Sequence, residues 1–201
     1  MTTYDLDTAT LRLIGEEDAP EVRAELSPGF LMSYNAAYAR LVRDRVRPRA
    51  TAEAVLLADG AALCGGYAPG CGILDLNAVD GAAALLAVTR GAQALPVARL
   101  GSGKWAVGGT AAGEGVRVEY VREAPALLGG ADPQAEHSEP DLLPEGAQMA
   151  LAHWAAYVYL SAARRYAAAS AQLELYRAAA QDAPRGAAPE LDRLTGLYGG
   201  A

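Results

Sequence analysis

The only lysine of the chain, Lys104, lies in LGSGKWAVGG (residues 100–109), where its glycine neighbours are typical of a phosphate-binding loop. Such a loop reads G-x-x-x-x-G-K-[ST], and its last hydroxyl binds magnesium. Here Ala98 replaces the first glycine and Trp105 replaces the hydroxyl residue. The loop must also lead into a helix whose N-terminal amides complete the anion site, whereas WAVGGTAAG is strand-like and then rich in glycine. We predict instead a hairpin turn at residues 101–103, because glycine adopts the positive φ that tight turns need.

Other residue types suited to catalysis or metal binding are few and scattered. Cys64 and Cys71 stand in CGGYAPGC, which is not a CxxC pair and has no nearby histidine, so a zinc site is poorly supported. The sequence does not decide whether Cys64 and Cys71 remain two thiols or form a disulfide, which would require an oxidising setting. His137 and His153 lack metal-ligand spacing, and no serine lies in a G-x-S-x-G motif. We predict a protein that is not an enzyme and has no cofactor or metal; a nucleotide-binding enzyme using Lys104 is the outlying alternative.

Arginines form the most concentrated group of charged side chains, at positions 40, 43, 45, 47 and 49. At helical spacing Arg40, Arg43 and Arg47 share one face near a helix end, where the helix dipole favours positive charge. They are candidates for contact with DNA phosphate or with an acidic partner surface, and a solvated helix end is the equal alternative. For Arg164 and Arg165 the same two interpretations apply: contact with DNA phosphate or an acidic partner, or simple exposure to solvent.

Composition limits the classes of function. The 201 residues carry a net charge of −7, which argues against a protein that binds nucleic acid tightly through a basic surface. Residues 147–163 contain no acidic residue, lysine or arginine, yet they fall short of the roughly 20 apolar residues of a membrane-spanning helix. We therefore predict a helix buried among protein neighbours and no contact with a membrane. The N-terminus has no secretory signal pattern.

Two helices are predicted before residue 50. Residues 5–15 can form a short helix with Asp7 or Thr8 as its cap. Ser27 is placed to cap a second helix with Pro28 in its first turn. An apolar stripe at three- and four-residue spacing predicts that this helix runs to about Val46 and ends before Pro48; the stripe consists of Phe30, Tyr34, Tyr38, Leu41 and Val42.

A β-rich region follows. Residues 116–121 alternate, with Val116, Val118 and Tyr120 on one side and Arg117 and Glu119 on the other, which is the pattern of a half-buried strand. Several short runs of this kind indicate an antiparallel sheet or small sandwich; the other runs are 54–58, 72–76, 85–89, 94–100 and 104–107.

The longest helix is predicted after the polar loop 131–141. Pro144 suits its first turn, and no break appears before Pro184, which gives about 38 residues and a rod of roughly 55 Å. A rod faced so largely with alanine cannot bury both sides within so small a chain, so neighbouring copies would cover it. The candidates for that subunit packing are Leu151, Trp154, Tyr157 and Val158.

The predicted fold class is therefore α+β, a small helical bundle with one long helix, an inserted antiparallel β-rich region and an extended C-terminal tail. The predicted boundaries place the first part of the helical core at 1–50, the β-rich insert at 51–139, the long helix at 140–182 and the tail at 183–201. The number of strands in the insert stays open.

The order of these parts resembles the head–tail adaptor (connector) proteins of tailed bacteriophages. LSPGFLMSYNAAYARLVRD (27–45) resembles the second helix of that family, and AVLLADG through GILDLNAV resembles its transition from strand to insert. LPVARLGSGKWAVGG resembles the family's hairpin, and VRVEYVREAPALL (116–128) resembles its closing strand. The closest match is EPDLLPEGAQMALAHWAAYVYL (139–160), in which an acidic-proline segment and Leu-Pro precede a helix rich in alanine, tryptophan and tyrosine.

The resemblance implies a structural protein of the virion neck, assembled in the host cytoplasm. Its copies would form a ring, a dodecamer, beneath the portal protein, join the capsid to a tail or neck protein, and line the channel for double-stranded DNA without sequence specificity. The tail residues Leu191, Leu194, Leu197 and Tyr198 would contact the portal. A negative channel would keep passing DNA from sticking. Another neck or tail-completion protein is the main alternative.

Overall fold

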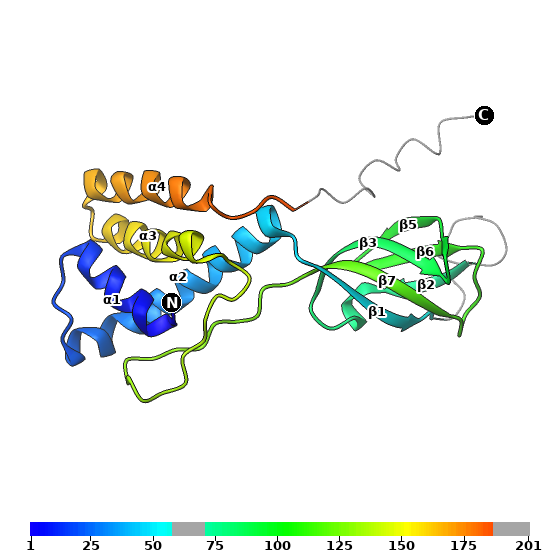
Figure 1. Ribbon diagram of the computed structural model, residues 1–201, viewed down its shortest axis with the longest axis horizontal. Helices are drawn as coiled ribbons and strands as arrows, with labels where there is room; N and C mark the ends of the chain where they lie inside the picture. Colours follow the sequence, from blue (N-terminus) through cyan, green and yellow to red (C-terminus); the bar gives the residue numbers. More distant parts are fainter. Residues whose placement is uncertain (58–70, 187–201) are drawn as a thin grey trace. The chain divides into compact units, whose positions relative to one another are not determined.

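We describe the protein from a computed structural model, which places residues 1–57 and 71–186 (Figure 1). The fold is α+β, as the sequence predicts, with helices and two antiparallel sheets. The described chain divides into a helical unit, made of Met1–Val46 and residues 124–186, and a β unit, made of residues 47–123. Residues 124–139, which the sequence analysis assigned to the insert, thus belong to the helical unit.

The helical unit is built around one helix, α3, which packs against each of the other three (Figure 1). Its core combines large buried side chains such as Tyr34 and Tyr38 with alanines of α3 that are almost fully buried. Alanine has no side chain beyond Cβ, so neighbouring helices approach α3 closely on several sides. The elements are α1 (Thr3–Ile14), α2 (Pro20–Leu41), the π-helical turn η1 (Val42–Val46), α3 (Glu145–Ala162) and α4 (Tyr166–Ala180).

Helix α1 begins earlier than predicted. Its N-cap is Thr2, whose hydroxyl accepts from the backbone N–H of Asp5 while the Asp5 carboxylate accepts from the backbone N–H of Thr2. This reciprocal pair satisfies two N–H groups that no helical carbonyl reaches. The prediction of Asp7 or Thr8 as the cap is therefore wrong, and Asp7 lies buried inside the unit.

Helix α2 also begins earlier, at Pro20, and not at Ser27 and Pro28. Ser27 is buried within the helix and donates to the Asp7 carboxylate, so its hydroxyl joins α2 to α1 rather than capping α2. Pro28 lies inside the helix. The predicted end holds, because the helical backbone continues through η1 and stops at Val46, ahead of Pro48.

The single long helix predicted after Pro144 is wrong, because the chain forms two helices, α3 and α4, that fold back on each other (Figure 1). The break falls at Arg164, whose φ of 59° is left-handed, without glycine or proline nearby. That conformation costs about 1 kcal/mol or more, which the burial of Ala169 and Tyr176 against the bundle outweighs. The helical core is therefore covered within one copy, and the packing argument for a ring fails.

The described part of the β unit contains two antiparallel sheets that enclose an apolar core, as expected for a small sandwich. The predicted alternation in the last strand is confirmed, since Val116, Val118 and Tyr120 are buried whereas Arg117 is exposed. One sheet has the order β1-β7-β3-β4 and the other β2-β6-β5. The strands are β1 (Arg49–Val55), β2 (Cys71–Asp75), β3 (Ala82–Arg90), β4 (Gln93–Ala94), β5 (Val97–Gly101), β6 (Lys104–Gly108) and β7 (Gly115–Arg122), and a 3-10 turn, η2 (Leu76–Ala78), follows β2.

The hairpin predicted at residues 101–103 is confirmed. It joins β5 to β6, with Ser102 at φ 48° and Gly103 at φ 76°. A Cβ on Gly103 would also collide with the amide group of Asn77, which donates to the Ser102 carbonyl oxygen at 2.8 Å.

Gly103→Ala is therefore expected to lower the free energy of unfolding of the β unit by about 1–3 kcal/mol, through left-handed strain and displacement of Asn77. Chemical denaturation followed by Trp105 fluorescence measures the change. Gly91→Ala provides a matched control, because Gly91 also has a positive φ, of 61°, but open space around its Cα. Equal losses in the two variants would mean that contact with Asn77 contributes nothing.

Candidate partner-binding surfaces

The residues singled out for catalysis do not converge in the described parts of the chain. Lys104 is the first residue of β6 and is exposed, so no helix N-terminus stands where a phosphate loop needs one. Across residues 1–57 and 71–186 no group of three or more histidine, cysteine, aspartate or glutamate side chains is arranged to hold a metal ion. Cys71 is buried in β2, and Cys64 lies outside the described residues.

The two histidines each join elements of the helical unit. His137 contacts the Thr3 hydroxyl through Nδ1 at 3.2 Å and the Asp132 carbonyl oxygen through Nε2 at 2.9 Å. These contacts attach the loop before α3 to the start of α1. His153 contacts the Gln172 side chain at 2.8 Å and so links α3 to α4.

The predicted arginine face is only partly formed. Arg40 and Arg43 are exposed near the end of α2, and Asp44 lies 3.7 Å from the first and 2.9 Å from the second. Arg47 does not share their face, because the helix has ended at Val46 and Arg47 has a left-handed φ of 48°. The correct group is therefore an exposed pair of arginines partly neutralised by one aspartate.

Arg164 and Arg165 lie in the turn between α3 and α4, at the opposite end of the helical unit from the C-terminal end of α2 (Figure 1). Arg165 donates to the carbonyl oxygen of Ile14 at 3.1 Å, so it also supports the end of α1. The four candidate arginines of the helical unit thus form no single patch, and Arg47 belongs to the β unit.

The four candidates for subunit packing differ in exposure. Leu151 is 0% exposed within one copy and cannot contact another, so that assignment is wrong. The Trp154 ring packs at 5.4 Å from Tyr157 and 5.1 Å from Tyr176 (centroid distances), and it too contributes to the unit's own core. Val158, 40% exposed, is the one of the four with a substantially exposed side chain.

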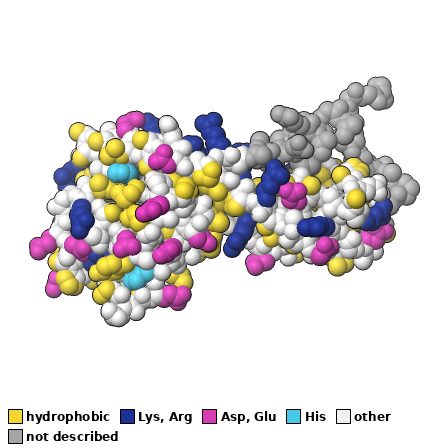
Figure 2. Space-filling model, in the orientation of Figure 1, with side chains coloured by type: hydrophobic (Ala, Val, Ile, Leu, Met, Phe, Trp, Pro, Cys, Tyr) yellow, Lys and Arg dark blue, Asp and Glu magenta, His cyan; other side chains and the backbone are white. Residues whose placement is uncertain are grey.

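Sequence reasoning missed two apolar surfaces that the structure exposes. The α2 outer face has Met32 at its centre, 75% exposed, and consists of Pro28, Gly29, Met32, Ala36 and Ala39. The α4 outer face has Leu175 at 46% exposure and consists of Ala167, Ala171, Leu175 and Ala178. On the side of the helical unit that Figure 2 shows, hydrophobic side chains reach the surface between acidic ones. The sequence does contain a signal for the α2 outer face: a second row of apolar residues on this helix, on the side opposite the stripe of Phe30 and Tyr34.

A buried polar network joins α1 to α2. Arg23 is 2% exposed and donates to Asp18, to the Thr8 hydroxyl and to the Tyr4 carbonyl oxygen. Asp7 accepts from Ser27 and Tyr34 and lies 3.9 Å from Arg23. Burial raises the pKa of the Asp7 carboxyl above its ordinary value, despite these donors and the nearby charge of Arg23.

The raised pKa of Asp7 gives an expected pH dependence. The folded state then binds a proton more readily than the unfolded state, so the Asp7 contribution to stability is greatest at low pH. It decreases as pH rises from about 3.8 through the folded pKa. We expect the free energy of unfolding of the wild type, minus that of Asp7→Asn, to fall over this range in urea titrations. A constant or rising difference would contradict the assignment.

Neither a scan against protein-family models nor a comparison with curated proteins gives a match. None of the helices in residues 1–57 and 71–186 combines the length and the apolar composition of a membrane-spanning segment.

Proposed function

We propose that this protein is a head–tail adaptor of a tailed bacteriophage, a structural component that joins the portal to a tail or neck protein. The observation that carries the proposal is the order of its parts. A helical pair, a β-rich segment and a second helical pair follow one another, and the start of the second pair, residues 139–160, has the closest likeness to that family.

The outer faces of α2 and α4 support assembly into a ring. Each face is apolar, and the two helices pack against α3 without extensive contact between them. Association of one face with the other on the next copy would be heterologous, and such contacts form rings when the rotation closes. The physical reason for a ring is therefore the association of these two outer faces, and not the need of one long helix for cover by neighbouring copies.

The charges fit a role beside passing DNA. A net charge of −7 disfavours tight binding of phosphate, while the exposed Arg40 and Arg43 provide a limited local attraction. Weak contact without sequence readout is what a channel requires. The portal-contact candidates Leu191, Leu194, Leu197 and Tyr198 lie outside the described residues, so this contact stays a prediction.

The test is assembly with the portal protein encoded in the same genome. Light scattering measures the mass of the purified chain alone and after mixing with the portal ring, and negative-stain images record where any added density lies. We expect several copies to attach to one pole of the portal as a closed ring. A stable monomer that leaves the portal unchanged, or a ring that binds tail protein but no portal, would overturn the proposal; the second result would favour a tail-completion protein.

A further inference from the structure

Within the described residues, the outer edge of β1 has no partner strand along most of its length. β1 is an end strand that pairs with β7 alone among the strands of the described chain. The Pro48 carbonyl oxygen accepts from the N–H of Arg122, and the Leu56 N–H donates to the Glu114 carbonyl oxygen. These bonds fix the phase of an antiparallel ladder, in which alternate residues face the partner. The backbone groups of Thr51, Glu53 and Val55 therefore point away from β7.

The strand β2 lies on this open side but leaves β1 after one contact. Leu57 and Ile73 exchange backbone hydrogen bonds of 2.7 and 3.4 Å. Continued antiparallel pairing would next set Val55 opposite Asp75. Asp75 instead accepts from the backbone N–H of Asn77 at 3.1 Å and begins the turn η2, so the chain diverges from β1.

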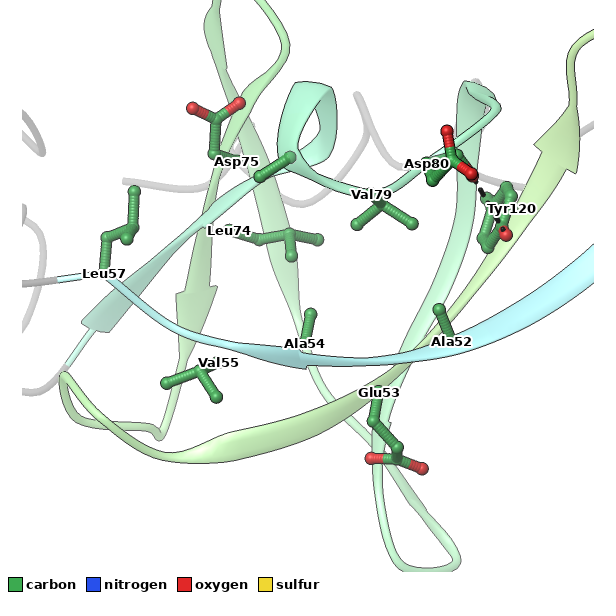
Figure 3. A pocket seen from close by; sticks show the side chains of 11 residues that line it. Ala52, Glu53, Ala54, Val55, Leu57, Leu74, Asp75, Val79, Asp80 and Tyr120 are labelled. Atoms are coloured by element: carbon green, nitrogen blue, oxygen red, sulfur yellow. Dashed lines mark hydrogen bonds between the residues drawn. The ribbon is translucent and has the colours of Figure 1, made fainter.

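The divergence leaves a pocket of about 410 Å³ between the two sheets (Figure 3). Ala52 and Ala54 of β1 point into it toward Leu74 and Val79, whereas the side chains of Glu53 and Val55 point away (Figure 3). The small alanine side chains leave the space that larger residues would fill. The pocket thus has an apolar floor beside a row of backbone groups that no other strand of the described chain pairs with.

Three carboxylates border the pocket, and no lysine or arginine is among its lining residues. The carboxylates belong to Glu53, Asp75 and Asp80. In the described part of the β unit the ion pairs join Arg49 to Glu119 and Arg90 to Glu114, so none of them includes these three carboxylates. Arg117 lies opposite Glu53 in the register of β1 and β7, and its guanidinium donates to the Thr51 hydroxyl at 3.4 Å. An occupant that supplies apolar and positively charged side chains would complement both features.

We propose that the β1 edge is a strand-addition site for an extended, basic segment of a partner protein. Alternate residues of an added strand face the same side, so one set of side chains enters the pocket over Ala52 and Ala54. The other set lies on the outer face beside Glu53, where arginine or lysine pairs with its carboxylate. Backbone hydrogen bonds to Thr51, Glu53 and Val55 supply affinity, and the pocket supplies selection. This site does not depend on the head–tail role.

The probe is a fluorescent, blocked peptide of about seven alternating arginine and valine residues, titrated onto the full-length protein and followed by anisotropy. A peptide with glutamate in place of arginine is the charge control, and amide spectra locate the binding site. We expect the arginine peptide to bind at least about tenfold more tightly than the glutamate peptide. Shifts should concentrate at the amides of Thr51, Glu53 and Val55.

The decisive variant is Glu53→Pro. Proline removes an N–H that faces the open edge and leaves the bonds to β7 in place, so the sheet should retain its melting temperature within a few degrees. Glu53→Gln removes the same charge but keeps the N–H, and is the matched control. We expect at least about tenfold weaker binding in the proline variant than in the glutamine variant. Ala54→Leu, which fills the pocket, should also weaken binding.

Two results would overturn the site. One is no binding of the arginine peptide at about 1 mM. The other is equal binding by the proline and glutamine variants, which would mean diffuse charge attraction rather than strand addition. Ring formation with the portal, measured on the same Glu53→Pro protein, distinguishes loss of this site from failure of the adaptor proposal.

Discussion

Arg23→Met is expected to lower the free energy of unfolding of the helical unit by about 3–5 kcal/mol, the range for removing one partner of a buried charge pair. Arg23 is almost completely buried, donates to Asp18, Thr8 and the Tyr4 carbonyl oxygen, and stacks 3.9 Å above the Tyr4 ring. Methionine fills similar volume but offers no donor. The variant also leaves the Asp7 carboxylate without its nearest cation. Denaturant unfolding followed by circular dichroism measures the decrease in the free energy of unfolding.

Two further variants isolate the cause. Arg12→Met changes an exposed arginine of α1 and should stay within about 0.5 kcal/mol of the wild type. Combining Arg23→Met with Asp7→Asn removes the uncompensated carboxylate, so the double variant should be less destabilised than the sum of the single ones. A loss below about 1 kcal/mol in Arg23→Met would show that the network contributes little to stability.

Met32→Glu is expected to abolish ring assembly while leaving the fold intact. Met32 is 75% exposed at the centre of the α2 outer face, so the substitution costs the isolated chain little. In a subunit contact the same carboxylate would be desolvated without a partner. A central contact of this kind contributes at least about 2 kcal/mol, or roughly a 30-fold change in affinity. Light scattering with and without the portal measures the change.

Leu128→Glu is the matched control for that prediction. Leu128 also lies in the helical unit and is 53% exposed, but it belongs to the loop before α3 and to neither outer face. Its variant should assemble as the wild type does. Leu175→Glu, on the α4 outer face, should reproduce the defect of Met32→Glu. Normal assembly of both outer-face variants would place the subunit contact elsewhere.

Much of the candidate partner-binding surfaces could not be predicted from the sequence. The arginine spacing correctly indicated Arg40 and Arg43 as exposed, but it included Arg47, which follows the helix end. Leu151 and Val158 belong to the same periodic pattern, yet the first is fully buried and the second is exposed. Periodicity identifies a face, but which helix covers that face depends on contacts between distant segments.

The sequence by itself determined those features that depend on a few neighbouring residues. The glycines at 101 and 103 permit a tight hairpin, Pro48 ends the helix before it, and alternating residues between 116 and 121 define a half-buried strand. Each follows from backbone dihedral preferences or from a two-residue period, which act over short distances.

Tertiary structure decided the rest. Arg164 breaks the C-terminal helix with no local signal, because folding α4 back onto α3 buries Ala169 and Tyr176. Asp7 and Arg23, polar residues that local pattern places on a surface or cap, are buried because each provides a partner for the other helix. Such burial energies come from groups far apart in sequence, and they outweigh local preferences of about 1 kcal/mol.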